Sequence, residues 1–287
     1  MQSSNNPGTT QPGNGPSSPY AFYWPITGDE LANNLIGGSK NEAIYGYGGD
    51  DVIDAGAGND IVYGGAGTDD ISGGTGNDTL WGGASLDYLY GENGNDVIHG
   101  EDAGDYIYGG QGNDILFGEA GGDRLNGGAN QDMLNGGDGN DRLEGAGGAD
   151  ILLGGAGNDN LQGDGDYNTS GIDGDDVLDG GAGNDRLFGD DGSDQLTGGA
   201  DHDQFFIDVA LAGNDVIMDF NAAEDSLILE GVLDADDPNV SLGASADGDV
   251  LLTFAGSGAT VELNGFQATN YANLGQLDAA IDITYQS

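Results

Sequence analysis

The chain has 287 residues, of which 51 are Asp or Glu and only 4 are Lys or Arg, so its formal charge is −47. A protein this acidic is repelled by nucleic acids and anionic membranes, which excludes both as partners. It contains no Cys for disulfides or thiolate metal sites, and its two histidines, His99 and His202, are too few for a zinc enzyme. Self-repulsion would expand such a chain, yet its hydrophobic residues (36%) are placed too regularly for a disordered one. Cations are therefore its natural complement.

Residues 1–27 precede the regular part of the chain and include the aromatic stretch YAFYWPI at 20–26. They carry no basic start and no continuous apolar run, so they do not resemble a Sec-type signal peptide. No stretch of the chain is long and apolar enough to span a membrane. We therefore expect a flexible N-terminal segment, no membrane insertion, and another export route if the protein leaves the cell.

Units of nine residues fill 28–162 and again 171–206, fifteen before and four after the extra residues GDGDYNTS (163–170). The eighth residue of every unit is apolar, and the sixth is Asp in all but the first two units, which have Asn33 and Glu42. The seventeen sixth-position aspartates are Asp51, Asp60, Asp69, Asp78, Asp87, Asp96, Asp105, Asp114, Asp123, Asp132, Asp141, Asp150, Asp159, Asp176, Asp185, Asp194 and Asp203. Degenerate end units are typical of a repeat array whose ends cap the stack.

A period of nine this strict indicates a solenoid. The last three residues of each unit can form a short strand with the eighth side chain inward, and the first six can form a turn. Glycines at the first, second and fourth positions permit positive φ angles and close approach of the backbone. Stacking at about 4.8 Å per turn brings the sixth-position carboxylates together, and a hard divalent ion would relieve their repulsion. Carboxylates and turn carbonyls form the all-oxygen cage that Ca²⁺ prefers.

The units resemble the RTX nonapeptide G-G-x-G-x-D-x-U-x, a calcium-binding β-helix repeat. Close matches are GGAGNDNLQ (154–162), GGTGNDTLW (73–81) and GGDGNDRLE (136–144). The resemblance implies an all-β, right-handed parallel β-roll over 28–206, with two units per turn and Ca²⁺ between successive turns on the same side. It also implies that the seventeen aspartates are the calcium ligands. Pairing each with the one two units later leaves 17 − 2 = 15 inter-turn sites.

Fifteen Ca²⁺ would set +30 against the charge of −47, so the chain should be compact only with calcium. The alternative is that the aspartates are ordinary turn residues, because Asn-Asp is common in turns. Some sites should be weaker, since the fourth-position glycine is replaced at Ser85, Ala103, Asn130 and Asp201. A side chain there would strain the backbone, least of all for Asn.

The extra residues contain a D-x-D-x-N run at Asp164, Asp166 and Asn168. This run is similar to an EF-hand loop, but Thr169 stands where the turn glycine belongs and no Glu closes the loop. The segment is either a further calcium site or an excursion from one edge of the roll.

Residues 207–287 show alternating apolar runs in place of the nonapeptide, with a Gly-Ser-Gly at 256–258 that indicates a hairpin. The segment GGADHDQFFID followed by GNDVIMDFNAAEDSLIL resembles the region after the repeats of type I-secreted bacterial RTX proteins. That resemblance implies a β-rich cap that leads into an uncleaved export signal. The alternative is a cap without export information.

The motifs of common enzymes are missing: there is no H-E-x-x-H, G-x-S-x-G, phosphate loop or Cys–His pair. Pairs of carboxylates could serve a glycosidase-like site, but calcium already accounts for them. We therefore predict that the protein is not an enzyme.

Outward side chains differ between the two sides of the predicted roll, because even-numbered and odd-numbered units build opposite faces. The even-numbered units carry apolar residues at their outward seventh position, which are Ile61, Val97, Ile115, Met133 and Ile151. Their ninth positions include Tyr45, Tyr63, Trp81, His99 and Phe117. We call this side the isoleucine face. Over eight turns it would be about 38 Å long, more than a monomer normally exposes. It should be covered by 20–26 or 207–287, by a second copy, or by another partner.

The odd-numbered units are polar at the same positions and include Arg124, Arg142 and Arg186. We call this side the arginine face. Its aromatic cluster is formed by Tyr88, Tyr90, Tyr106 and Tyr108. Aromatic rings beside cations can hold sugars, although four tyrosines on two strands are also ordinary cross-strand pairs.

These observations predict a secreted, extracellular or cell-surface bacterial protein that folds on calcium. Its most direct role is structural, as a self-associating surface-layer, filament or matrix component. The alternative is a glycan-binding or adhesive module linked to polysaccharide modification.

Overall fold

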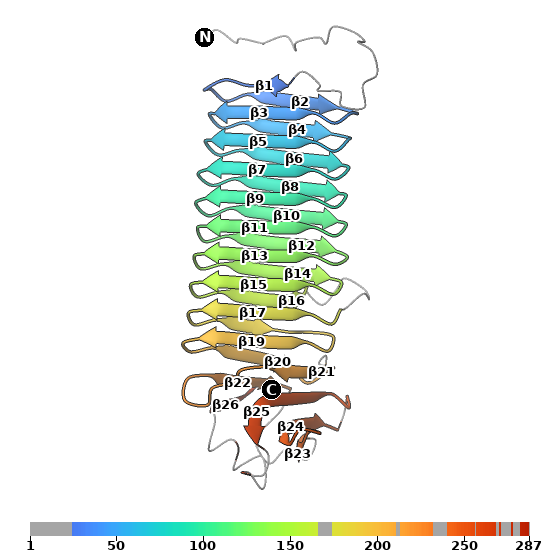
Figure 1. Cartoon of the computed structure of the whole chain (residues 1–287), viewed down its shortest axis with the longest axis vertical. Helices are drawn as coiled ribbons and strands as arrows, with labels where there is room; N and C mark the ends of the chain where they lie inside the picture. Colours follow the sequence, from blue (N-terminus) through green and yellow to red (C-terminus); the bar gives the residue numbers. More distant parts are fainter. Residues whose placement is uncertain are drawn as a thin grey trace.

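The computed structural model describes residues 25–165, 174–210, 213–231, 240–255, 257–267, 270, 277 and 282–286. They form two long sheets that face each other along a stack of turns (Figure 1). Consecutive strands along the repeats alternate between the sheets, and each pairs in parallel with the strand two places later, as Ile115 does with Met133. The predicted all-β parallel β-roll is therefore confirmed. In the described part of the chain, no helix is long and apolar enough to cross a membrane.

The outer surface of the first sheet is the isoleucine face. Its fourteen strands, in spatial order, are β1 (Ile26–Thr27), β3 (Ala43–Gly48), β5 (Ile61–Ala66), β7 (Thr79–Ala84), β9 (Val97–Asp102), β11 (Ile115–Ala120), β13 (Met133–Asp138), β15 (Ile151–Ala156), β17 (Val177–Ala182), β19 (Gln195–Ala200), β21 (Asn214–Ile217), β25 (Thr260–Gln267), β24 (Asp249–Phe254) and β23 (Val240–Ala244).

The outer surface of the second sheet is the arginine face. Its twelve strands, in spatial order, are β2 (Asn34–Gly38), β4 (Val52–Gly56), β6 (Asp70–Thr75), β8 (Tyr88–Asn93), β10 (Tyr106–Gln111), β12 (Arg124–Ala129), β14 (Arg142–Gly147), β16 (Asn160–Asp164), β18 (Arg186–Phe188), β20 (Gln204–Asp208), β22 (Ser226–Glu230) and β26 (Asp282–Gln286).

Most strands of the repeats are six residues long, twice the predicted length. Each runs from the seventh residue of one unit to the third residue of the next, as in β11. The pairing between strands continues into the first three residues of the next unit, where Glu119 pairs with Gly137 and Ala120 pairs with Asp138. The prediction of a six-residue turn was wrong, because those residues pair with their equivalents in the neighbouring turn. Three residues, 121–123, separate β11 from β12.

The core is a column of eighth-position side chains from both sheets. Leu80, Leu89, Ile98, Ile107 and Leu116 are all 0% exposed, whereas the seventh and ninth residues on either side point outward. Burying one such Leu or Ile side chain contributes about 1.5–3 kcal/mol. The inward eighth position is confirmed, and the apolar Ile115 next to Leu116 has no place in this core.

Both ends of the roll are closed by strands that extend the sheets. At the N-terminal end, Ile26 pairs with Ile44, while residues 20–24 of the aromatic stretch lie outside the described residues. At the other end, β22 and β26 continue the second sheet in parallel. The antiparallel strands β24 and β25 form the predicted hairpin, although Gly256 is not among the described residues. These C-terminal strands lie at the end of the stack and not over the isoleucine face (Figure 1).

Candidate metal-binding ladder

The seventeen sixth-position aspartates lie inside the roll at its turns, and each is 3% exposed or less. One carboxylate oxygen, Oδ1, accepts a hydrogen bond from the backbone N–H of the sixth-position residue two units earlier, which is an aspartate for all but Asp51 and Asp60. Asp96 N–H donates to Asp114 Oδ1 at 2.7 Å, and Asp114 N–H donates to Asp132 Oδ1 at 2.8 Å. Two ladders of aspartates therefore run along the roll, one at each edge.

The extra residues at 163–170 do not interrupt the ladders. Asp150 N–H donates to Asp176 Oδ1 and Asp159 N–H donates to Asp185 Oδ1, both at 2.8 Å, so the contact passes directly over the insertion. Asp164 is buried at the end of β16 and pairs with Ala146. Gly163 and Asp164 therefore belong to the stack, and the prediction that the excursion begins at Gly163 was wrong. Asp166 and Asn168 of the predicted EF-hand-like run lie outside the described residues.

The second carboxylate oxygen, Oδ2, is buried without a hydrogen-bond partner in all seventeen aspartates. A buried carboxylate left half-satisfied is costly unless a cation is present. Burial, with repulsion from neighbouring aspartates, raises the pKa of Asp87 to about 8 and that of Asp194 to about 9. Ordinary turn aspartates would bond within their own turn. Bonds between turns and the unpartnered Oδ2 atoms argue against that alternative.

In most units Oδ2 points toward the first glycine of the same unit, where a side chain would collide with it. A Cβ added to Gly109 would meet Asp114 Oδ2 at 2.5 Å and the carbonyl oxygen of Gly127, one turn later, also at 2.5 Å. A carboxylate oxygen and a carbonyl oxygen thus approach the same space. In the described part of the chain, no three His, Asp or Glu side chains form one metal cluster. Backbone carbonyls would therefore complete the shell, and this all-oxygen donor set fits Ca²⁺.

Asparagines at the fifth position form a second ladder beside the first. Asn95 N–H donates to Asn77 Oδ1 at 3.1 Å, and Asn113 N–H donates to Asn95 Oδ1 at 3.0 Å. These bonds connect the turns in the direction opposite to the aspartate bonds. Sequence reasoning missed this role, although the recurring Asn-Asp pair was its signal.

The aspartate ladders continue beyond the last nonapeptide. Asp194 N–H donates to Asp215 Oδ1 at 3.2 Å, and Asp203 N–H donates to Asp225 Oδ1 at 3.1 Å. Both new aspartates are buried. Sequence reasoning missed them, and the available signals were GNDVI at 213–217 and EDSLI at 224–228.

Backbone strain occurs where another residue replaces one of the glycines that recur in the nonapeptide. Ser85, Ala103, Asn130 and Asp201 have φ angles of 90°, 82°, 86° and 84°, in the left-handed region. This agrees with the strain expected at the fourth position. The second position, where glycine was also expected to permit positive φ, is strained as well, although the sequence analysis did not single out the units that lack glycine there. Its non-glycine residues with positive φ are Tyr47, Glu92, Glu101, Glu119, Ala146 and Asp190.

The family model of the RTX calcium-binding nonapeptide repeat agrees with this geometry. It matches six segments, of which the first three overlap, and they are residues 27–62, 36–71, 63–98, 99–134, 135–169 and 170–205. Among solved structures, the extracellular lipase LipA from Serratia marcescens is similar over 65% of this chain and 40% of the lipase chain, with 20% identity and a TM-score of 0.26. The chain thus spans less than half the length of that lipase. A comparison with curated protein sequences finds no match.

Proposed function

Because this chain belongs to the RTX calcium-binding nonapeptide repeat family, we propose that it is a secreted bacterial protein that calcium folds outside the cell. Proteins of this kind bind several calcium ions through their repeats. The buried Oδ2 atoms support the coupling to folding, since seventeen of them lack a partner inside the roll. Without cations these carboxylates oppose folding, so the chain would stay expanded at low cytosolic calcium and could pass through an export channel.

The ligands we propose are the sixth-position aspartates, with Asp215 and Asp225 as continuations of the ladders. Fifteen hydrogen-bonded steps join the seventeen aspartates, such as Asp132 to Asp150 at 2.8 Å. An ion at each step would bring +30 and reduce the net charge from −47 to −17. Calcium ions between successive aspartates would neutralise the buried carboxylates. The hydrogen bonds between the aspartates would set the spacing of the turns.

The isoleucine face carries our proposal for the protein's role outside the cell. Ile61 is 42% exposed and Ile151 is 43% exposed, and Val97, Ile115 and Met133 are half-buried only by one another and by their neighbours on the strands. None of the described N-terminal or C-terminal residues lies over them. An uncovered apolar surface of this length favours association.

A ladder of aromatic rings runs beside these residues along the same face. The ring centroids of Tyr45, Tyr63, Trp81, His99 and Phe117 follow one another at 5.2, 4.5, 5.4 and 4.8 Å, and the rings are nearly parallel. Such stacking makes the face flat and rigid. We propose that it docks on a second copy of the chain, and that the protein is a structural component of a surface layer, filament or matrix, without catalytic activity.

A glycan site at the tyrosine cluster is the second candidate, and the ring geometry favours it less. Tyr88 stacks on Tyr106 with centroids 5.1 Å apart, and Tyr90 stacks on Tyr108 at 5.3 Å. Arg124 covers the other side of Tyr106 at 5.3 Å. Sugars stack on free ring faces, and here half of the ring faces already contact one another and one more lies under Arg124.

Ile115→Asp tests the proposal, with Leu31→Asp as its matched control, because Leu31 is an exposed apolar residue between β1 and β2 and outside both sheet faces. In millimolar calcium, the wild type and Leu31→Asp should form large particles by light scattering. Ile115→Asp should stay monomeric while gaining the same circular dichroism signal on calcium addition. A monomeric wild type, or an Ile115→Asp variant that associates normally, would contradict the proposal. Saturable binding of a polysaccharide by the monomer would then support the second candidate.

A further inference from the structure

Three of the chain's four Lys and Arg residues stand in one column of the arginine face. Arg124 pairs with Arg142 in the ladder, Arg142 pairs with Asn160, and Asn160 pairs with Arg186. All three arginines begin their strands and are exposed. Most of the positive charge of this acidic chain therefore lies in one outward column. A column of this kind is suited to bind an anionic partner.

The three arginines have few partners within their own chain. Arg124 lies 5.3 Å from the ring of Tyr106, and Arg186 lies 5.0 Å from the ring of Phe206. The ion pair of Arg142 with Glu144 is long, at 3.9 Å, and it is the only one that the arginines make among the described residues. The guanidinium groups of Arg124 and Arg186 lie over rings, and all three arginines remain available to carboxylates from outside.

The isoleucine face carries exposed carboxylates near the ends of its strands. Glu101 and Asp102 end β9, and Glu119 lies one turn further along in β11. Glu119 accepts from His99 at 2.8 Å. Within the described part of the chain, the side chains of Glu101 and Asp102 make no hydrogen bond or ion pair, and both are exposed. They are therefore available to a cationic group from outside.

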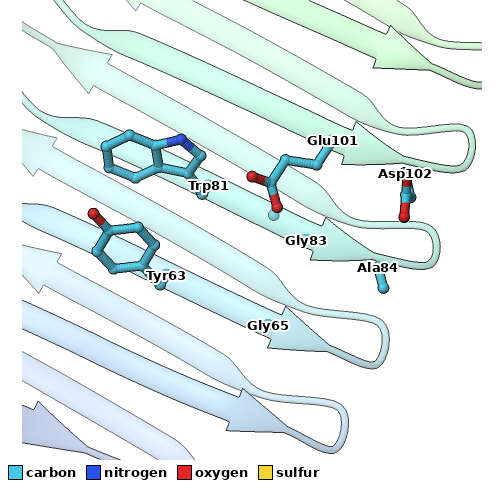
Figure 2. A pocket seen from close by; sticks show the side chains of 8 residues that line it. Tyr63, Gly65, Trp81, Gly83, Ala84, Glu101 and Asp102 are labelled. Carbon is cyan, nitrogen blue, oxygen red and sulfur yellow. The ribbon is translucent and has the colours of Figure 1, made fainter.

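A hollow of about 240 Å³ lies beside these carboxylates. Figure 2 shows the carboxylate of Glu101 next to the indole ring of Trp81, with Asp102 on the far side. Gly65 and Gly83 form part of the lining, because they have no side chain to fill the surface. The faces of the Trp81 ring are covered by Tyr63 and His99, so the ring edges and the glycine lining offer apolar surface for an aliphatic stem, and the carboxylates offer acceptors for its charged end.

The strands of the two sheets run in opposite directions (Figure 1). If a second roll is placed on the first without rotation, the isoleucine face of one copy meets the arginine face of the other. The start of each strand on one face then lies over the end of a strand on the other face. On both faces the seventh position, at the start, carries large side chains, and the second position, near the end, is mostly glycine. Ile115 and its column would lie over Gly110 and Gly128, and Arg124 and its column would lie over Glu101 and Glu119.

We propose that the isoleucine face of one copy docks on the arginine face of the next, with the arginines inserted beside the carboxylates and glycines of the hollow. This inference rests on the self-association proposed above and names the second surface. Both faces repeat at the same spacing of about 4.8 Å, so a match at one turn is repeated at its neighbours. Because the two docking surfaces differ, a copy that has used one of them still has the other free. Further copies can therefore add, and the assembly does not close on itself.

Docking of two isoleucine faces on each other is less favourable. The same opposition of large and small positions would place Glu101 and Glu119 against the isoleucine column of the partner copy, with no arginine opposite them. On the arginine face the carboxylate next to Gly110 is Glu92, which already accepts from Ser72 Oγ at 2.7 Å. Burying Glu101 and Glu119 without a cation costs free energy. Such a contact would also close as a dimer, because each copy has one isoleucine face.

Two variants, each blocked on one face, test the inference. Ile115→Asp blocks the isoleucine face, and Arg124→Glu combined with Arg142→Glu blocks the arginine face. Each alone should lose growth into large particles in calcium, with association at least tenfold weaker, and each should keep calcium-induced folding by circular dichroism. Lys40→Glu, a charge reversal away from both columns, should assemble as the wild type does. Mixed in equal amounts, the two blocked variants should form a 1:1 pair that grows no further.

Assembly of the double arginine variant at wild-type strength would overturn the inference and leave self-association standing. A mixture in which light scattering finds no 1:1 pair would overturn it as well. A wild type that stays monomeric in millimolar calcium would instead overturn the self-association on which the inference rests.

Discussion

Replacing one ladder aspartate by its neutral isostere should destabilise the protein with calcium and stabilise it without. Asp132 is suited to this test because it lies in the middle of the roll, 3% exposed. Its Oδ1 accepts from Asp114 N–H at 2.8 Å, and its Oδ2 is buried without a partner. Asp132→Asn keeps the shape and the amide oxygen that can accept this bond. It removes the negative charge that a calcium ion would neutralise.

The size of the effect follows from binding linkage. An ion at one hundred times its dissociation constant stabilises the folded state by about 2.7 kcal/mol. Asp132 joins two steps of the ladder, toward Asp114 and toward Asp150, so the loss should be about 2.7 kcal/mol for one ion and about twice that for two. For a domain of this size, the melting temperature should fall by roughly 5–20 °C.

In chelator the sign should reverse. Burial, and then repulsion from Asp150 and Asp114, raises the pKa of Asp132 to about 8, because the charged form is unfavourable there without a cation. Asp132→Asn removes that unfavourable charge, so the variant should be more compact than the wild type in chelator near neutral pH.

Thermal unfolding by circular dichroism, at fixed free calcium and in chelator, measures both effects. Asp70→Asn is the matched control, because Asp70 carries the same charge on an exposed strand position. The reasoning would be refuted if Asp132→Asn behaved like Asp70→Asn, or if it destabilised the protein equally with and without calcium.

Three further predictions concern protons, glycines and the extended ladder. Burial raises the pKa of Asp87 to about 8 and of Asp194 to about 9 from an ordinary 3.8. In chelator, the circular dichroism signal of the strands should therefore be present near pH 4 and be lost as the pH rises through 8–9. Equal signals near pH 4 and above pH 9 would contradict this. Gly112→Ala should destabilise the roll by more than the roughly 1–2 kcal/mol of left-handed strain, because its Cβ would meet the previous turn. Gly258→Ala is the control, since a Cβ there would meet nothing within 4 Å and the variant should cost the strain alone. Equal losses of stability in thermal unfolding would argue against close stacking. Asp215→Asn should lower the number of calcium ions bound in equilibrium dialysis, and an unchanged number would exclude a site there.

Much of the fold could be predicted from the nine-residue period. An apolar eighth residue and an acidic sixth residue, repeated without a break, specify inward side chains and aligned carboxylates whichever strand is considered. The presence of an insertion could also be recognised, because the frame resumes after it, but its start could not, since Gly163 and Asp164 complete the strand β16.

The period could not predict features that depend on the neighbouring turn. Asp215 and Asp225 were missed because the glycines that mark the frame end with the repeats, and their partners lie 21 and 22 residues earlier instead of 18. The positive φ at Glu101 was missed because stacking imposes it, whatever side chain is present. The exposure of Ile115 depends on where the C-terminal strands lie, and a local pattern does not contain that information.

A calcium titration followed by circular dichroism, starting in chelator at pH 8, tests the central claim most directly. We expect little strand signal at the start, because buried carboxylates without cations oppose folding. The signal should appear cooperatively as calcium rises, and light scattering should increase after it. Full strand content in chelator would contradict the account, since the ladder would then hold its carboxylates together without the ion that we assign to it.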